Sequence, residues 1–206
     1  VGRWEHRFTV EEFLNNMKVS ISADGTVVQY GGQFPTNQVH LLAYNGSVYN
    51  SAVGRTTLLV EGGRLQSMDV SEDGSVVAHA SQSVVRVGDI RDNNNNNNKL
   101  VLFRPNVNVL LDPTALIPGI QVDIALSADG SRLIVAWTAP NRPVQVRAFQ
   151  WIKDGNDDGA GVWTNRGLET LSLYRDRVAT RVAVSLSGSR LAVAAGGILR
   201  LYDLPM

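Results

Sequence analysis

The sequence predicts an all-β protein that is built from repeated antiparallel units of four strands. One eight-residue pattern occurs four times along the 206 residues, and short segments of alternating apolar residues follow each copy. Such alternation is typical of strands with one buried face. Aromatic residues recur with the pattern: Tyr49 lies 22 residues before Ser71, and Trp163 lies 22 residues before Ser185. This regular spacing indicates that the repeats extend along the chain.

The repeated pattern reads apolar–x–apolar–Ser–x–x–Gly–Ser/Thr. The glycines are 49, 56 and 58 residues apart, and Asp precedes three of them. Asp-Gly is a strong turn signal, because glycine adopts the positive φ that a β-carbon opposes. Each copy therefore predicts a hairpin turn that follows a first strand. The four copies are Val19–Thr26, Met68–Ser75, Ile124–Ser131 and Val182–Ser189.

Three further strands are expected after each first strand. A second strand follows the turn directly, a third follows it and often carries arginine, and a fourth is marked by Tyr49, Phe103 or Trp163. The expected second strands are Val27–Tyr30, Val76–Ala80, Leu133–Trp137 and Leu191–Ala195. The expected third strands are Val39–Tyr44, Val84–Val87, Val144–Trp151 and Ile198–Tyr202.

Four strands per unit at this period are the signature of a β-propeller blade. We therefore expect residues 1–206 to form one all-β domain, a β-propeller of about four four-stranded antiparallel blades, or an excised part of a larger propeller. The last repeat stops after its third strand, while residues 1–8 resemble a fourth strand marked by Trp4. Residues 1–8 either complete that last blade, which would hide two sheet edges, or the chain is cut from a larger ring. The expected blades are 17–60, 66–104, 120–167, and a split blade of 180–204 with 1–8.

The units resemble WD40-type and FG-GAP-like propeller repeats, of the form V-x-L-S-x-D-G-S-x-L-A-V…V-R-V-Y-x-W…W. The unit from Val122 to Trp163 is the most similar, and Arg181–Asp203 is a second example. The sequence departs from both families, because it has no Phe-Gly-Gly-Ala-Pro run and no regular Gly-His or terminal Trp-Asp pair. The resemblance implies an architecture and no particular chemistry.

Composition limits the classes of partner. Lys plus Arg and Asp plus Glu each total 19, so the net charge is zero. A nucleic-acid or anionic-membrane partner is favoured by a basic excess, and we expect neither. No apolar run approaches the roughly 20 residues that span a bilayer. The chain has no cysteine, which excludes disulfides and thiolate zinc sites and leaves the compartment undecided.

One acidic loop is a candidate metal site. The run from Asp154 to Gly159 matches the opening of a D-x-N-x-D-G calcium loop, with Asp154, Asn156 and Asp158 as oxygen ligands. FG-GAP-type propellers carry calcium loops between strands, so the resemblance implies calcium as a possible cofactor. The ninth and twelfth positions are Val162 and Asn165, where ligands are required. The favoured interpretation is a solvated hairpin loop without metal.

An arginine-rich group is the candidate partner site. Its members fall in loops that are expected at the end of the blades opposite the Ser–x–x–Gly turns. Arginine is favoured at protein interfaces because it forms planar bidentate contacts, although structural ion pairs explain the group equally well. The group consists of Arg64, Arg142, Arg175, Asp176 and Arg177.

Three other features are interpreted as structural. Asp24, Asp73 and Asp129 precede turn glycines and are expected to be turn residues. The tract Asn93–Asn98 is predicted to be a disordered surface insertion. The three histidines, His6, His40 and His79, fall in expected strands with no catalytic motif beside them.

The function predicted from these features is a non-enzymatic interaction scaffold that binds a protein or peptide on the loop face. The alternative is an extracellular calcium-stabilised adhesion or glycan-binding propeller. A propeller hydrolase or lyase is a third class, which would need a convergent His/Asp/Glu set in the axial channel.

Overall fold

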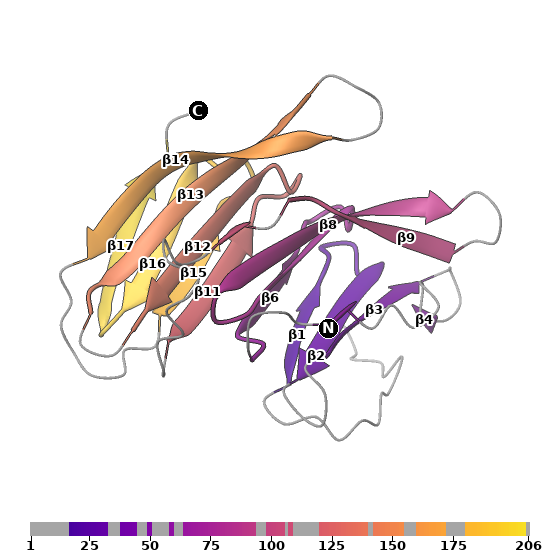
Figure 1. The fold of residues 1–206 in the computed structure, drawn as a ribbon, viewed down its shortest axis with the longest axis horizontal. Coiled ribbons are helices and arrows are strands. Elements are labelled where there is room, and N and C mark those ends of the chain that lie inside the picture. Colours follow the sequence, from indigo (N-terminus) through magenta and orange to yellow (C-terminus); the bar gives the residue numbers. More distant parts are fainter. Residues whose placement is uncertain are drawn as a thin grey trace, which may run out of the picture.

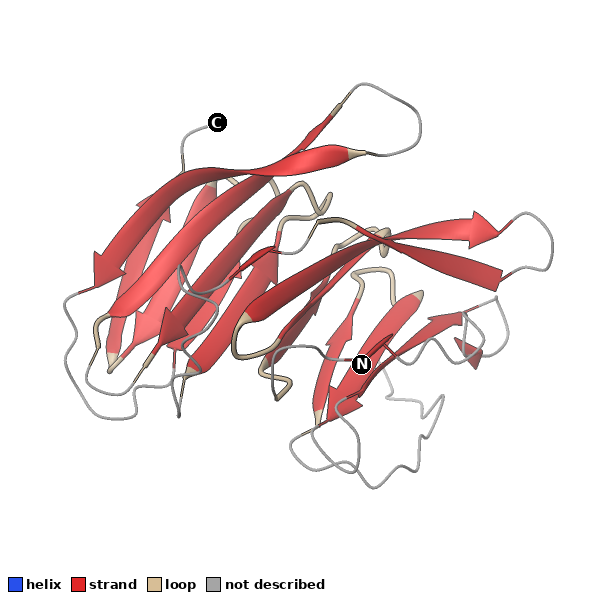
Figure 2. Cartoon of the chain, in the orientation of Figure 1, coloured by secondary structure: helices blue, strands red, loops and turns tan. Residues whose placement is uncertain are grey.

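The computed structural model describes residues 17–32, 38–44, 49–50, 58–59, 64–93, 98–105, 107–108, 120–139, 142–154, 160–171 and 180–204. Within these ranges the chain forms 17 strands and no helix. The strands make four antiparallel sheets that follow one another in a row (Figures 1 and 2). No helix among these residues is long and apolar enough to cross a membrane.

Each sheet is a meander in which the first three strands pair in chain order, and the strands that follow pair with the third strand. The first contains β1 (Lys18–Ile21), β2 (Val27–Gly32), β3 (Gln38–Tyr44), β4 (Tyr49–Asn50) and β5 (Leu58–Leu59). The second contains β6 (Ser67–Val70), β7 (Val76–Ala80), β8 (Val84–Asn93), β9 (Asn98–Phe103) and β10 (Val107–Asn108). The third contains β11 (Gln121–Leu126), β12 (Arg132–Thr138), β13 (Val144–Lys153) and β14 (Gly161–Leu171). The fourth contains β15 (Thr180–Val184), β16 (Arg190–Ala195) and β17 (Ile198–Asp203).

The predicted fold class is confirmed, since four blade-like antiparallel sheets are present with the expected first, second and third strands. The fourth sheet has three strands among the described residues. Residues 1–8, which were expected to supply its fourth strand, lie outside the described part of the chain, so their place in the ring stays a prediction.

The fourth strand is less regular than the sequence predicts. In the third sheet β14 is continuous, with a register shift opposite Ala148 and Phe149 of β13. In the second sheet the same place is divided, because β9 pairs with the far half of β8 and β10 pairs with Val84 and Val85. The first sheet is divided in the same way between β4 and β5. At the place where the third sheet has a bulge, the fourth strand of the first and second sheets is divided into two separate strands.

The two ends of the asparagine tract differ from the predicted disordered insertion. Asn93 ends β8 and Asn98 begins β9, and the two residues form the last pair of the hairpin ladder. The interpretation of the whole tract as an irregular loop is therefore wrong at its ends. Residues 94–97 lie outside the described part.

The core lies between sheets, in three clusters that join each sheet to the next. Strand β7 shows the principle, because all five of its residues are buried. Its Val76 and Ala78 belong to the cluster shared with the third sheet, and its Val77 belongs to the cluster shared with the first. Full burial of a valine or leucine side chain contributes about 1.5–3 kcal/mol, so packing between neighbouring sheets is a main source of stability.

The hairpin turns after the first strands meet at one end of the sheets. The Ala23 N–H donates to the Glu72 carbonyl at 3.0 Å, Glu72 N–H to the Ala128 carbonyl at 3.0 Å, and Ala128 N–H to the Leu186 carbonyl at 3.1 Å. This series aligns the four turns and fixes the first strands β1, β6, β11 and β15 side by side along the inner surface. The opposite end carries the starts of those strands.

Candidate functional site

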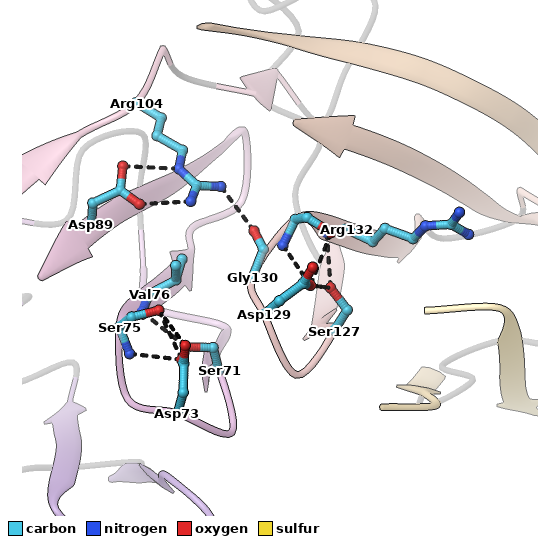
Figure 3. Close-up of polar contacts among 11 residues, drawn as sticks. Ser71, Asp73, Ser75, Val76, Asp89, Arg104, Ser127, Asp129, Gly130 and Arg132 are labelled. Carbon is cyan, nitrogen blue, oxygen red and sulfur yellow. Dashed lines mark hydrogen bonds and ion pairs between the residues drawn. The ribbon is translucent and has the colours of Figure 1, made fainter. Parts of the chain in front are cut away.

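The three aspartate-containing turns have the same internal hydrogen bonds, and Figure 3 shows those of Asp73 and Asp129. In the second repeat the Ser71 hydroxyl donates to Asp73 Oδ1 at 2.7 Å and accepts the Val76 N–H at 2.8 Å. Asp73 Oδ1 also accepts the Ser75 N–H at 2.9 Å. Partial burial raises the pKa of Asp73, but the hydrogen bonds from Ser75 and Ser71 outweigh it and leave the pKa below the usual value. Equivalent bonds hold Asp24 and Asp129.

These aspartates are therefore turn residues, as predicted, and their oxygens are already engaged. The fourth turn has Ser187 instead, whose hydroxyl lies 3.4 Å from Ser185 Oγ and 2.7 Å from Ser189 Oγ. A ring of free carboxylates is not formed by the turns.

The inner surface of the first strands encloses a hollow of about 450 Å³, and two aspartates line it. Asp69 Oδ2 accepts the Leu126 N–H of the next sheet at 2.6 Å, and its Oδ1 accepts the Ser20 hydroxyl of the preceding sheet at 3.3 Å. Burial raises the pKa of Asp69 above its usual value, and the nearby charge of Asp123 adds to this.

Asp123 repeats this arrangement one sheet further on. Its Oδ1 accepts the Ser67 hydroxyl at 2.7 Å and its Oδ2 accepts the Val182 N–H at 2.9 Å. Each aspartate thus bridges three consecutive first strands. Among the described residues no group of three His, Cys, Asp or Glu could hold a metal ion. The two aspartates of this surface form hydrogen bonds between neighbouring sheets.

Sequence reasoning did not single out this pair. A signal existed, because Asp69 lies two residues and Asp123 four residues before the turn serine. In each strand the aspartate interrupts an otherwise mostly apolar run, which marks a polar group that needs a partner. The difference of two residues between the repeats hid their equivalence.

Arg104 joins the second and third sheets from within (Figure 3). Its guanidinium is buried and binds Asp89 in bidentate fashion, with Nη2 at 2.6 Å from Oδ1 and Nε at 3.1 Å from Oδ2. Nη1 donates to the Gly130 carbonyl at 2.8 Å. The same group lies 4.8 Å from the ring centre of Trp151 and 5.3 Å from that of Trp163. Arg104 is structural and unavailable to a partner.

His79 has the local setting of a buried core residue. Burial lowers the pKa of its imidazole to about 4, and the charge of Arg86 acts in the same direction. Neither ring nitrogen has a hydrogen-bond partner, and the ring meets Phe103 edge-on with centroids 6.2 Å apart. His40, which lies in β3, stacks on Tyr30 at 4.9 Å. Both histidines are therefore strand residues, as predicted; His6 lies outside the described part.

Two of the five predicted partner residues can be placed. Arg64 lies shortly before β6 and Arg142 shortly before β13, and both are exposed. The register pairs the start of β6 with the end of β7, and the start of β13 with the end of β12. Both arginines therefore lie at the end opposite the hairpin turns. Arg175, Asp176 and Arg177 lie outside the described part.

Of the predicted calcium ligands, Asp154 is described. It is exposed after the end of β13, and its N–H donates to the Ala160 carbonyl at 3.0 Å. That bond continues the hairpin ladder of β13 and β14. Asn156 and Asp158 lie outside the described residues, so this ligand set stays a prediction.

No protein-family model and no curated protein matches the chain. Solved structures match its fold at low identity. A putative 6-phosphogluconolactonase from Bacteroides uniformis is 13% identical with a TM-score of 0.60, and the match covers 90% of this chain and 49% of that one. The β-propeller domain of Cps50 (Swd1) from Myceliophteria thermophila is 11% identical with a TM-score of 0.56, covering 91% and 50%. KlAtg21, in complex with the coiled coil of AgAtg16, is 12% identical with a TM-score of 0.58, covering 92% and 54%.

These matches confirm the β-propeller architecture and the resemblance to WD40-type propellers at the level of the fold. The chain spans about half the length of each of these structures. Their names cover different functions, as expected for a fold that serves as a general framework.

Proposed function

We propose that this chain is a non-enzymatic scaffold that binds a protein or peptide at the end of the sheets that carries Arg64 and Arg142. The observation that carries the proposal is the state of these two guanidinium groups. Both are exposed, and neither has a hydrogen bond or ion pair within the described part of the chain. Arg104, by contrast, is buried with every nitrogen bonded.

The bonding of the inner surface is compatible with the same proposal. Asp69 and Asp123, the carboxylates that line it beside Glu72, are engaged in bonds between sheets. These bonds between sheets make the two aspartates part of a rigid framework, and rigid frameworks commonly carry binding residues on their loops.

The chemistry of arginine defines the class of partner. A guanidinium binds a carboxylate through two parallel hydrogen bonds, so we expect an acidic segment of a protein or a peptide rich in Asp and Glu. KlAtg21, which has the same fold, is solved with a protein partner, and this precedent is compatible with the proposal. Arg175 and Arg177 would extend the same surface.

The proposal is tested by selecting peptides from a random displayed library on the wild-type chain. The selected peptides are then titrated against Arg64→Ala, Arg142→Ala and Arg175→Ala variants, singly and combined. We expect enrichment of acidic residues and at least a tenfold loss of affinity in the combined variant, since interface arginines often contribute more than about 1.4 kcal/mol.

The matched control is Arg166→Ala, which removes an exposed arginine from the outer strand β14 and should leave affinity unchanged. If the combined variant binds the selected peptides as tightly as the wild type, the arginine-bearing end is not the binding surface. Retention of the wild-type melting temperature in each variant shows that a loss of binding is local.

A further inference from the structure

A second buried arginine is stacked on a tryptophan of the third sheet. The Arg147 guanidinium lies 4.9 Å from the ring centre of Trp137, and the Arg104 guanidinium lies 4.8 Å from that of Trp151. Both arginines are more than nine-tenths buried, at 8% and 6% exposed. The two pairs have similar stacking and similar burial, so they can be compared directly.

The two arginines differ in their hydrogen bonds. Every nitrogen of the Arg104 guanidinium has an acceptor, either Asp89 or the Gly130 carbonyl. Arg147 Nε, by contrast, is enclosed without a hydrogen-bond partner. Its two terminal nitrogens have no hydrogen bond or ion pair with the described residues either, but they are not fully enclosed. One end of the Arg147 guanidinium is therefore accessible and lacks an acceptor.

The strand register places Arg147 on the face toward the second sheet. It pairs with Val135, which belongs to the core cluster shared with that sheet, and Trp137 lies two residues further along β12 on the same face. Because the guanidinium lies over Trp137, the side chain extends along β12 toward Thr138, where that strand ends. This is the end of the sheets that also carries Arg142.

The charge of Arg147 is not neutralised by a described acid. Burial lowers the pKa of its guanidinium, and burial is the only cause of this shift. A buried charge without a counter-charge costs free energy. Folded chains commonly keep such costly features where a ligand binds. A ligand with a negative charge would supply the missing partner.

The surroundings of the guanidinium define the class of ligand. Because Nε is enclosed, the two terminal nitrogens remain for bonding, and their parallel N–H groups fit the two oxygens of a carboxylate. A phosphate, which has more charge, would favour a second cation, and no described cation acts on the pKa of Arg147. Stacking on Trp137 holds the guanidinium in one orientation, which lowers the entropy cost of binding.

We infer that Arg147, positioned by Trp137, binds a single carboxylate group of the acidic partner. The inference rests on the proposed function, because it names the place where one Asp or Glu side chain of that partner is held. Five residues of chain separate Arg142 from Arg147, a distance of about 17 Å at most. An extended acidic peptide of about five residues therefore spans both arginines.

The first test uses glutarate as the probe and NMR of the tryptophan indole N–H groups as the readout. The Trp137 signal is identified by its loss in Trp137→Phe. We expect glutarate to move this signal along a saturable curve. The signals of Trp151 and Trp163 should stay in place, because Arg104 beside them is already fully bonded. A Trp137 signal that does not move would overturn the inference.

Two further compounds and one variant make this test specific. Glutaramide has the same chain without charge and should leave the signal in place, and inorganic phosphate should bind more weakly than glutarate. Arg147→Met keeps an apolar side chain over Trp137 but removes the charge, so it should weaken glutarate binding at least tenfold. An equal response to glutaramide, tighter binding of phosphate or an unchanged affinity in the variant would each overturn the carboxylate site.

The stability of Arg147→Met separates a ligand site from a structural contact. Replacement of a buried charge by an apolar side chain of similar size is often neutral or stabilising, so the urea midpoint should stay the same or rise. Arg104→Met is the matched control and should lower the midpoint, because it leaves Asp89 and the Gly130 carbonyl without their donor. Equal falls in both variants would show that the Arg147 guanidinium holds the junction, and would overturn the inference.

Acidic peptides selected on the wild-type chain connect this site to the proposed function. Peptides that lose at least tenfold in affinity for Arg147→Met would support both. Peptides that depend on Arg64 and Arg142 but bind Arg147→Met as tightly as the wild type would support the proposed function and overturn this inference. If no acidic peptide is selected, the proposed function fails, while the glutarate titration still decides whether Arg147 binds a carboxylate.

Discussion

Substitution of Arg104 by alanine is expected to be among the most damaging single changes to this chain. The substitution removes a bidentate ion pair with Asp89, a hydrogen bond to the Gly130 carbonyl and the contact with two tryptophan rings. Arg104 and Asp89 belong to the second sheet, whereas Gly130 and the tryptophans belong to the third. The substitution therefore weakens one sheet-to-sheet junction.

The magnitude follows from burial. Removal of one partner from a buried ion pair costs about 3–5 kcal/mol, and an unsatisfied buried carbonyl costs about 1–3 kcal/mol. The Asp89 side chain is 22% exposed, so water compensates part of the first cost, and the contributions overlap. We expect the free energy of unfolding to fall by about 3–4 kcal/mol, a large share of the 5–15 kcal/mol that is typical of a domain.

The assay is urea denaturation followed by tryptophan fluorescence at fixed protein concentration, with Trp151 and Trp163 as local reporters. The urea midpoint should fall with an unchanged slope. Arg104→Lys should give an intermediate loss, because lysine keeps the charge but not the bidentate geometry. Lys153→Ala, at the exposed end of β13, is the control and should change stability by less than about 0.5 kcal/mol. A loss below about 1 kcal/mol for Arg104→Ala would refute this account of the junction.

Four further substitutions give three predictions. Ser187→Asp should raise the free energy of unfolding by about 0.5–1 kcal/mol at neutral pH. The hydrogen bonds of the other turns lower the pKa of their aspartates in the folded state, so the gain should disappear in thermal melts as the pH falls below about 4. Gly130→Ala should cost more than Gly197→Ala in urea titrations: both glycines have positive φ, at 63° and 78°, but a β-carbon at Gly130 collides with Val76 whereas none lies near Gly197. Equal losses would show that backbone strain alone, about 1–2 kcal/mol, decides both. The His79 imidazole has a pKa of about 4 in the folded chain, against an ordinary value of 6.5. As the pH falls from 6.5 to 4 the unfolded chain therefore binds a proton before the folded chain does, and the free energy of unfolding should fall by about 3 kcal/mol. His79→Leu should remove that part of the pH dependence, and an unchanged pH profile would contradict the assignment.

The fold was predictable because the information for each hairpin is local. The Ser71 hydroxyl, the Asp73 carboxylate and the turn glycine specify a turn within five residues, and apolar runs such as β7 and β12 specify the strands that follow such turns. A period of this kind needs no knowledge of distant contacts. The repeat alone was therefore sufficient to predict both the strands and their order.

The contacts between sheets were not predictable in the same way. Asp69 and Leu126, or Arg104 and Gly130, are far apart in the sequence and meet only when two sheets pack. The equivalent positions of other repeats hold different residues, so the repeat pattern does not identify the partners. Exposure of Arg64 and Arg142 was predictable from their place in loops, whereas the division of the fourth strand into β9 and β10 depended on a bulge that has no sequence signal.

This division between local and distant information also bears on where function can reside. The sheets share their core clusters with neighbouring sheets, and the polar groups of the inner surface join neighbouring strands. A change of chemistry there would weaken the framework, as a change of Arg104 is expected to do. Arg64 and Arg142 lie in loops outside these contacts between sheets, and loop residues can commonly vary without loss of the fold. For this reason the proposed binding function falls on residues that differ between repeats.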